Sequence, residues 1–211
     1  TLYGLNFAKS AIKLAGYVIL VEGYMDLISL FQNGVENVVA SSGTSLTQLH
    51  AKILSRYTKE VVVVFDSDLA GENASRRAIE LIIENDMNVS IIPLPAGDDP
   101  DTYIKKHGTE GFDKLLGKRK NIIEYIGEGY RSKGKLGSPE GKTEFVREII
   151  GLIAKMRDEI KRDFYIKDIS ERFSIYESII RKELDKNAKL RSKGLTRELV
   201  TKPTDEIQLK K

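Results

Sequence analysis

The fold of this chain is decided by one stretch of its sequence, Val61-Val62-Val63-Val64-Phe65-Asp66-Ser67-Asp68-Leu69-Ala70-Gly71. Five apolar, strand-favouring residues lead directly into two carboxylates that are one residue apart, and an amphipathic run follows over residues 72–86. This order predicts a buried strand that delivers Asp66 and Asp68 to the carboxyl edge of a sheet, where open α/β sheets bind their ligands. Two neighbouring carboxylates repel each other, so they need a cation or strong hydrogen bonds. The alternative is that the two acids form a turn or cap the helix that follows.

The rest of the first half repeats the same pattern of apolar runs and amphipathic segments. Further strands are predicted at residues 17–21, 35–40 and 87–94, and helices at residues 1–16, 24–32, 46–57, 102–107 and 109–116. Strands that alternate with helices specify a parallel α/β sheet, and the strands do not alternate with polar residues, so both of their faces are buried. We therefore expect a parallel sheet flanked by helices.

The strand signals stop after Gly117, and the remaining patterns are helical. We expect a small all-α helical subdomain after the α/β sheet, and divide the chain into a lead-in (1–16), an α/β metal-binding domain (17–117), the helical subdomain (118–189) and a polar linker or tail (190–211). Residues 167–181 have the rhythm of a helix-turn-helix. We favour a plain helical bundle over a DNA-groove reader, with a core formed by Ile169, Phe173, Ile175, Ile179 and Ile180.

The composition excludes several classes of protein. The chain has 211 residues and no Cys, which rules out disulfides and thiolate metal sites and fits a cytoplasmic protein. No run approaches the roughly 20 apolar residues of a membrane span. Residues 1–117 hold 10 Lys/Arg against 15 Asp/Glu, whereas residues 118–211 hold 24 against 16. The acidic half suits a divalent metal, and the basic half suits either a polyanion or an ordinary solvated surface.

Other acids follow other predicted strands. Glu22 comes directly after the strand at residues 17–21, and Asp99 and Asp101 follow the strand at residues 87–94. Each has a plainer interpretation: an exposed strand end for Glu22, and turn or helix-cap chemistry for the other two. Because parallel strands bring their carboxyl ends to one edge, we expect these acids to gather near Asp66.

The sequence signals for phosphate binding and for a functional histidine are weaker than those for the acids. Residues 41–47 offer hydroxyls and backbone N–H groups at a helix start, which suits phosphate binding or simple capping. There is no Gly-x-x-x-x-Gly-Lys-Ser/Thr motif, so a P-loop is excluded. His50 and His107 lie in helical patterns, and we interpret both as structural or solvated.

Four motifs occur in order at fitting distances, namely Glu22-Gly23-Tyr24-Met25-Asp26, Gly43-Thr44-Ser45-Leu46-Thr47, Asp66-Ser67-Asp68-Leu69-Ala70-Gly71 and Asp99-Pro100-Asp101. Together they resemble the Toprim domain of topoisomerases, primases and some nucleases. Their particular form is similar to that of bacterial replicative primases of the DnaG type, and the resemblance covers roughly residues 1–190.

The resemblance implies a set of site residues. Glu22, Asp66 and Asp68 would be catalytic and hold divalent metal, with Asp99 and Asp101 completing the cluster; a general-base role for Glu22 stays open. Gly43, Thr44 and Gly71 would contact nucleotide phosphates. The implied metal is Mg²⁺, for which Mn²⁺ can substitute.

The implied reaction is RNA primer synthesis on single-stranded DNA at the replication fork, by metal-dependent transfer of ribonucleotides. The partners would be the template, ribonucleoside triphosphates and the RNA primer. The chain begins with Thr1, so we expect an excised core with weak or no activity of its own. A zinc module and a basic subdomain would precede it, and a domain that binds the replicative helicase would follow residue 200. Two rivals remain: a Toprim nuclease or topoisomerase, and a scaffold without catalysis that binds nucleic acid.

Overall fold

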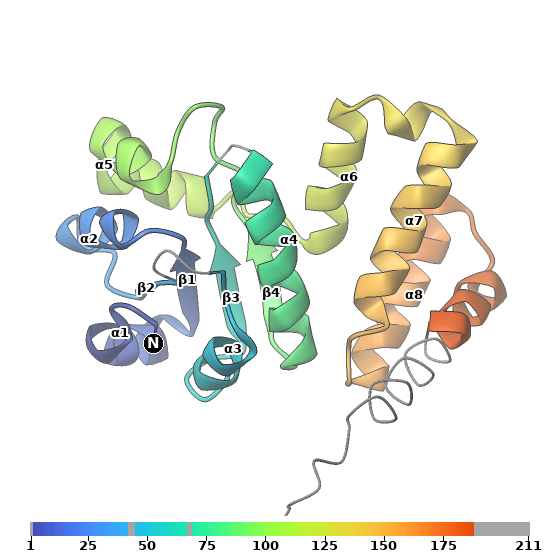
Figure 1. Cartoon of the computed structure of the whole chain (residues 1–211), viewed down its shortest axis with the longest axis horizontal. Coiled ribbons are helices and arrows are strands. Elements are labelled where there is room, and N and C mark those ends of the chain that lie inside the picture. Colours follow the sequence, from blue (N-terminus) through green and yellow to red (C-terminus); the bar gives the residue numbers. More distant parts are fainter. Residues whose placement is uncertain (1, 42–44, 67–68, 188–211) are drawn as a thin grey trace, which may run out of the picture.

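The structure, a computed structural model, describes residues 2–41, 45–66 and 69–187. Within these residues the chain forms a four-stranded parallel sheet with helices on both faces, followed by a group of helices packed beside the last strand (Figure 1). The α/β sheet and the helical second half were both predicted, and both are confirmed.

All four strands are short, and the residues that they bury are apolar, as a sheet covered on both faces requires. They are β1 (Tyr17–Val21), β2 (Val38–Ala40), β3 (Glu60–Val63) and β4 (Asn88–Ile91), in the sheet order β2-β1-β3-β4. The register pairs Leu20 with Val39 on one side and with Val63 on the other. Parallel pairing places every carboxyl end at the same edge of the sheet.

Alternate strand residues pack against different helices. Ile19 and Val21 join the apolar cluster beneath α2 (Tyr24–Gln32) and α5 (Pro100–Leu116). Val18 and Leu20 join the cluster on the opposite face, which is covered by helices α1 (Leu5–Ala15), α3 (Gln48–Leu54) and α4 (Leu69–Glu84). The period-two pattern of a strand therefore decides which layer each residue stabilises.

The chain order creates a crevice between the two central strands. From β1 the chain runs outward to β2, then crosses back to β3 on the other side of β1, and continues to β4. The strand order reverses between β1 and β3, and open α/β sheets bind ligands at such a point. The residues that follow β1 and β3 are therefore the first candidates for a functional site.

The second half is helical, as predicted. It consists of α6 (Ile122–Ser132), a 3₁₀ turn η1 (Lys135–Gly137), α7 (Pro139–Ile153), α8 (Glu159–Phe173) and a helix over residues 177–187. Each of the three long helices has a side-chain cap at its start, from Asn121, Ser138 and Asp158.

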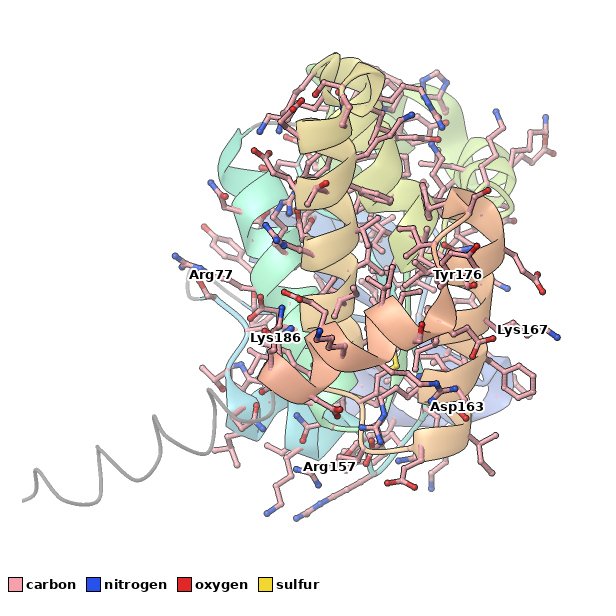
Figure 2. The ribbon with its side chains drawn as sticks, turned by 90° about the vertical axis from the view of Figure 1, so that its right-hand side faces the viewer. Arg77, Arg157, Asp163, Lys167, Tyr176 and Lys186 are labelled. Carbon is pink, nitrogen blue, oxygen red and sulfur yellow. The ribbon has the colours of Figure 1, made fainter. Side chains whose placement is uncertain are left out.

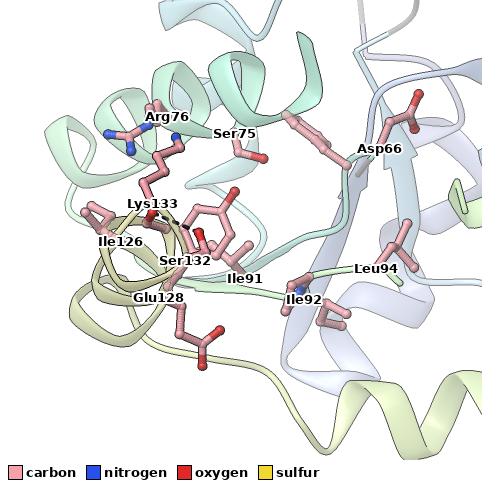
Figure 3. A pocket seen from close by; sticks show the side chains of 14 residues that line it. Asp66, Ser75, Arg76, Ile91, Ile92, Leu94, Ile126, Glu128, Ser132 and Lys133 are labelled. Carbon is pink, nitrogen blue, oxygen red and sulfur yellow. Dashed lines mark hydrogen bonds between the residues drawn. The ribbon is translucent and has the colours of Figure 1, made fainter. Parts of the chain in front are cut away.

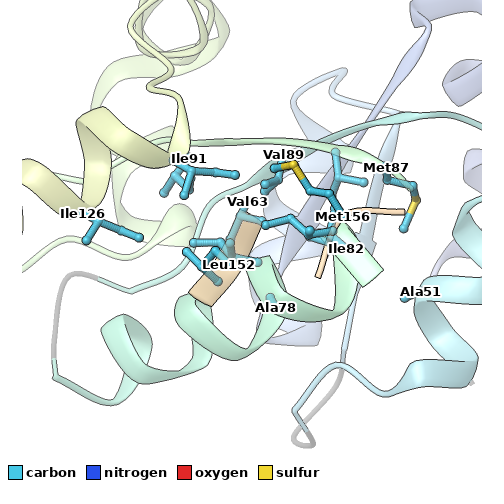
Figure 4. Packing of buried hydrophobic residues seen from close by; sticks show 14 of the residues in the cluster. Ala51, Val63, Ala78, Ile82, Met87, Val89, Ile91, Ile126, Leu152 and Met156 are labelled. Atoms are coloured by element: carbon cyan, nitrogen blue, oxygen red, sulfur yellow. The ribbon is translucent and has the colours of Figure 1, made fainter. Parts of the chain in front are cut away.

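The hydrophobic core runs without a break from the sheet into the helical half. Ile126, Leu152 and Met156 belong to the same buried cluster as Val63 and Ile82 (Figure 4). At the surface, Lys155, just beyond the end of α7, bonds Glu80 of α4 at 2.7 Å, and Lys120 forms a short bridge with Ile91 at the end of β4. The boundary that we predict near residue 117 thus separates two kinds of secondary structure that share one core.

The second strand has different bounds from those predicted. It is shorter than residues 35–40, because Val35 instead closes the turn after α2 by donating to the carbonyl of Leu30 at 3.0 Å. The two helices predicted over residues 102–107 and 109–116 are confirmed: the backbone of Gly108, with φ 64° and ψ −175°, is not helical and divides α5 there. Gly tolerates this left-handed conformation without the steric cost of a side chain.

The helix-turn-helix segment folds as part of the bundle, with one exception to its predicted core. Ser174 makes the turn with φ 53° and ψ 43°, and Ile169 and Ile180 are fully buried. Phe173 and Ile175 are partly buried against the same core. The prediction for Ile179 is wrong, because this side chain is 57% exposed.

The continuous core predicts that the two halves unfold together. Replacing Ile126, which is 2% exposed, with Ala should lower the free energy of unfolding by about 2–5 kcal/mol. Urea unfolding followed by circular dichroism and by tyrosine fluorescence should still show one coincident transition. Ile160→Ala, at a side chain that is 73% exposed, is the matched control and should change stability by less than about 0.5 kcal/mol. Two separate transitions would contradict the shared core.

Candidate metal and nucleotide site

Two of the predicted acids line one cavity at the carboxyl edge of the sheet. Glu22 follows β1, Asp66 follows β3, and both border a cavity of about 600 Å³. The strands that carry them are paired up to this edge, where the N–H of Val64 donates to the carbonyl of Leu20 at 3.0 Å. The cavity therefore opens at the point where the strand order reverses.

Burial makes these two carboxylates electrostatically costly. Oε1 of Glu22 and Oδ1 of Asp66 are both shielded from solvent. Burial penalises an ionised carboxylate, and a second negative charge nearby adds to the penalty. A divalent cation bound between carboxylate oxygens offsets both effects, and carboxylate oxygen is a donor that Mg²⁺ accepts.

A third acid at this edge, Asp26, is buried on the first turn of α2 and was not among the predicted site residues. Its Oδ2 accepts from the N–H of Gly23 at 2.9 Å, and its Oδ1 accepts from the N–H of Asp101 at 3.4 Å. Burial raises the pKa of Asp26 to about 6, and the charges of Asp66 and Asp99 add to that rise, while its two backbone hydrogen bonds oppose it. Asp26 belongs to the motif that begins at Glu22 and was given no role from the sequence, and the fold places it among the acids of this edge.

Asp99 and Asp101 have identifiable structural partners. Asp99 is the N-cap of α5 and accepts from the N–H of Thr102 at 2.6 Å. Asp101 accepts hydrogen bonds from Ser29 and, at 2.7 Å, from Lys105, and these contacts lower the pKa of Asp101. The sequence allowed Asp101 to cap the following helix, but in the structure the cap of α5 is Asp99. Their role as metal ligands stays a prediction.

Three predicted site residues, Gly43, Thr44 and Asp68, lie outside the described residues. Across the described ranges, no group of three or more His, Asp or Glu side chains is close enough to hold a metal ion. At the end of the 41–47 segment, Thr47 caps α3 by accepting from the N–H of His50 at 3.2 Å. His50 itself is buried, and burial lowers its pKa.

Gly71 has a steric reason to be glycine. A Cβ at this position would collide with the backbone of Asp66, because α4 begins against the segment that carries this acid. The glycine therefore allows the helix and the acidic segment to approach each other. Its predicted contact with phosphate stays a prediction.

Two polar side chains of α4, a cation and an amide, line the cavity. Asn73 and Arg77 are one helical turn apart and both line the cavity that contains Glu22 and Asp66. Arg77 is exposed and makes no ion pair with any residue in the described ranges, so its guanidinium remains available to an anion. Sequence reasoning missed Arg77 because nothing in a helical run shows which turn faces the sheet edge.

Asp66 also borders a second cavity, of about 500 Å³, between the end of β4 and α6. Figure 3 shows Asp66 and Arg76 on opposite sides of this space. Arg76 forms an ion pair with Glu148 of α7. The segment that carries Asp66 is thus bordered by the sheet-edge cavity and by the contact region with the helical half.

The sheet, the crevice and the acids define a Toprim-class domain, and comparison with known proteins agrees. The sequence model described as Toprim-like matches residues 19–104. A second model, described as the DnaB-helicase binding domain of primase, matches residues 123–178.

Comparison with individual proteins identifies the family more narrowly than the domain models do. The chain is 40% identical over 179 residues to a DNA primase of Clostridium acetobutylicum, covering 85% of this chain and 30% of the relative. It is 36% identical over 187 residues to the DNA primase of Aquifex aeolicus, covering 89% of this chain and 36% of the relative. The chain thus spans about a third of the length of these relatives.

Solved structures give the same result. The crystal structure of the Aquifex aeolicus primase zinc-binding and RNA polymerase domains aligns with a TM-score of 0.75 at 35% identity, covering 85% of this chain and 43% of that one. A DNA primase domain from Pseudomonas aeruginosa aligns with a TM-score of 0.77 at 29% identity, covering 87% and 59%. The chain belongs to the bacterial primases of the DnaG type.

One expectation changes in the light of these matches, and one is supported in general form. We expected the helicase-binding part to follow residue 200, but the matching model falls on residues 123–178, inside the helical half. A Toprim primase core also implies the use of a divalent metal ion, which the acidic cavity fits. In the described ranges, no helix is long and apolar enough to cross a bilayer.

The effect of the Asp66 charge on the pKa of Asp26 should be measurable. Carboxyl ¹³C NMR should show Asp26 titrating near pH 6 in the native chain and at lower pH in Asp66→Asn, because one repelling charge is gone. A raised pKa means that the folded chain holds this proton more tightly than the unfolded chain does. The contribution of Asp26 to stability is therefore full below its ordinary pKa of 3.8 and is lost as pH rises to about 6. Asp113→Asn is the control, and an unchanged Asp26 titration in Asp66→Asn would contradict the cluster.

Proposed function

We propose that this chain carries the catalytic centre for RNA primer synthesis on single-stranded DNA, by metal-dependent nucleotidyl transfer. The observation that carries the proposal is the cavity at the strand reversal, which Glu22 and Asp66 line with shielded carboxylate oxygens just beyond the ends of two neighbouring strands. The similarity to DNA primases supports the reaction, and one solved relative is a DnaG catalytic domain bound to single-stranded DNA, with a TM-score of 0.69.

The proposed metal is Mg²⁺, held by Glu22 and Asp66, with Asp68 as a further ligand and with Asp99 and Asp101 close to the same edge. When bound, the metal would lower the pKa of the attacking 3′-hydroxyl and neutralise charge on the departing pyrophosphate. Mg²⁺ uses a few carboxylates and leaves positions for water and substrate phosphates, which suits a cavity with two acidic walls. Mn²⁺ would substitute.

The protein's own side chains would position the nucleotide. Arg77 lines the same cavity as the two acids, so its guanidinium would be placed to bind phosphate oxygens of a ribonucleoside triphosphate. Gly43, Thr44 and Gly71 would offer backbone N–H groups to the same phosphates. Asp26 links the loop at Gly23 to the start of α5 through its two backbone hydrogen bonds, and so acts as a positioning residue.

The proposed partners are the single-stranded template, ribonucleoside triphosphates, the RNA primer and a DnaB-type replicative helicase. The helicase would contact the helical half, since the matching family model lies there. These partners would place the protein at the replication fork. A zinc site would belong to a separate amino-terminal module.

Two other functions make different predictions. A Toprim nuclease or topoisomerase would cleave DNA strands when given Mg²⁺, whereas a primase would extend ribonucleotides without cleavage. A scaffold that only binds nucleic acid would keep its DNA binding when its acids are neutralised, and it would have no catalytic activity to lose. One assay with labelled DNA and labelled ribonucleotides separates the three.

Neutralising either cavity acid should weaken metal binding and greatly reduce primer synthesis. For Glu22→Gln and Asp66→Asn in the 211-residue chain, we expect Mn²⁺ affinity by isothermal titration calorimetry to fall at least tenfold, since half of the paired carboxylates is lost. In the full-length protein that contains this chain, we expect primer synthesis to fall by a factor of about 100 or more.

Glu60→Gln is the matched control, because Glu60 begins the same strand, β3, at the opposite edge of the sheet. It should leave Mn²⁺ binding and synthesis unchanged. Primer synthesis retained in Asp66→Asn would contradict the proposed site. Equal losses of synthesis in Glu60→Gln would show that the variants act only by disturbing the structure.

Arg77 should act on nucleotide binding. Arg77→Gln should raise the KM for ribonucleoside triphosphates about tenfold or more, the equivalent of one charge-assisted hydrogen bond worth about 1.5–3 kcal/mol. Mn²⁺ affinity of the chain should stay within about twofold, because Arg77 is not a ligand. Arg56→Gln, at an exposed cation beyond the end of α3, should change neither quantity. An unchanged KM in Arg77→Gln would refute this role.

A further inference from the structure

The sheet-edge cavity, which Glu22 and Asp66 line, has a neighbour that the proposed function leaves without an occupant. This second cavity, of about 500 Å³, lies between the end of β4 and α6, and we call it the α6 cavity. The two cavities share one wall, which is formed by Phe65 and Asp66. Both volumes fall within the range of clefts that bind small ligands.

Helix α4 contributes to both cavities from different sides. Asn73 and Arg77 line the sheet-edge cavity, whereas Ser75 and Arg76 line the α6 cavity. Figure 2 shows Arg77 extending outward from α4 at the edge of the view, and Figure 3 shows Arg76 and Asp66 on opposite sides of the α6 cavity. Two ligands could therefore occupy the two cavities together, with the segment that carries Asp66 between them.

Among the described residues that line these cavities, Asp66 is the one carboxylate that borders both. Glu22 and Asp26 line only the sheet-edge cavity, and Glu128 lines only the α6 cavity. A transfer reaction needs two substrates at one centre, because the reacting atoms must approach each other to about 3–3.5 Å. A cavity on each side of one proposed metal ligand provides this arrangement.

The apolar part of the α6 cavity suits a nucleobase. Ile91 at the end of β4, with Ile92 and Leu94 just beyond it, forms one apolar side. Tyr125 of α6 is half-buried and adds an aromatic ring to the lining. Bases stack on aromatic side chains without regard to sequence, because every base has a π-face. An enzyme that copies varied templates needs this kind of tolerance.

The polar part of the same cavity suits a sugar and a phosphate. Ser75 and Ser132 bring hydroxyl groups, which can donate to and accept from the hydroxyls of a ribose. Lys133 is exposed at the end of α6 and brings a positive charge, which suits a phosphate of a nucleic acid backbone. The lining as a whole therefore matches one nucleotide of an RNA strand.

We propose that the α6 cavity holds the 3′-terminal nucleotide of the RNA primer, while the sheet-edge cavity holds the incoming ribonucleoside triphosphate. The inference rests on the proposed function and names the site of its second substrate. In the transfer, the 3′-oxygen forms a bond to the α-phosphorus, the bond from that phosphorus to the oxygen of the leaving pyrophosphate breaks, and the hydroxyl proton passes to solvent. A template base fits the cavity less well, because the reaction does not require the template to approach Asp66.

Photocrosslinking in the full-length protein that contains this chain tests where the primer end binds. An RNA primer with 4-thiouridine at its 3′ end, annealed to a DNA template, should crosslink on irradiation to peptides from residues 121–133, identified by mass spectrometry. The same primer with 4-thiouridine at its 5′ end is the control and should not crosslink to these peptides, because only the 3′ end enters the cavity.

Extension of the annealed primer by the same protein tests the residues. Lys133→Gln should raise the KM for the primed template about tenfold and leave the KM for ribonucleoside triphosphates within about twofold, because one phosphate contact is lost. Ser132→Trp, at an exposed residue, should fill the cavity and raise the primer KM further. Arg131→Gln is the matched control: Arg131 is exposed on the same helix but does not line the cavity, so neither KM should change. Thermal melts check that the three variants are folded.

Several outcomes would overturn the primer site. These are crosslinks from the 3′ end that lie only outside residues 121–133, a native primer KM in both Lys133→Gln and Ser132→Trp, and equal losses in Arg131→Gln. A raised KM for ribonucleoside triphosphates with a native primer KM would assign the cavity to the incoming nucleotide. An equal loss of affinity for unprimed single-stranded DNA would assign it to the template. Failure of the proposed function is seen separately, as a native protein that extends no primer, and crosslinking would still locate the primer end.

Discussion

The parallel pairing of β1 with β3 is the interaction on which the rest of the site depends. The hydrogen bonds that join these strands continue to the carbonyl of Leu20, so the next residues along each strand emerge together at one edge. The same pairing buries Val and Ile on both faces of the sheet, which stabilises the strands where the acids begin. A slip by one residue would turn every strand side chain to the wrong face, so apolar burial also holds Glu22 and Asp66 in place.

The fold gives the acids at this edge different tasks. Glu22 and Asp66 line the cavity, Asp26 bridges two backbone segments beside it, and Asp99 and Asp101 hold the start of α5 through capping and through contacts with Ser29 and Lys105. Hydrogen bonds from Lys105 and Ser29 lower the pKa of Asp101, whereas burial, with a smaller effect from the charges of Asp66 and Asp99, raises the pKa of Asp26. Carboxylates that are shielded from solvent and gathered around one cavity make this edge suited to a divalent cation.

The helical half is joined rigidly to the sheet and is not a loosely attached appendage. Met156 and Ile126 complete the core that covers α4 and β4. At the surface, Arg76 joins α4 to α7, and Lys155 joins the turn after α7 to α4.

The sequence by itself determined the alternation of strands and helices, the switch to an all-helical half, and the acids at strand ends, because apolar periodicity and strand-end position are local properties. It also reached the family, through four ordered motifs. Only the tertiary structure decided which acids meet, because that depends on strand order, and strand order is not local. For the same reason it alone placed Asp26 and Arg77 at the cavity, made Asp99 the cap of α5, and left Ile179 at the surface, since the face that a helix buries depends on the neighbours that pack against it.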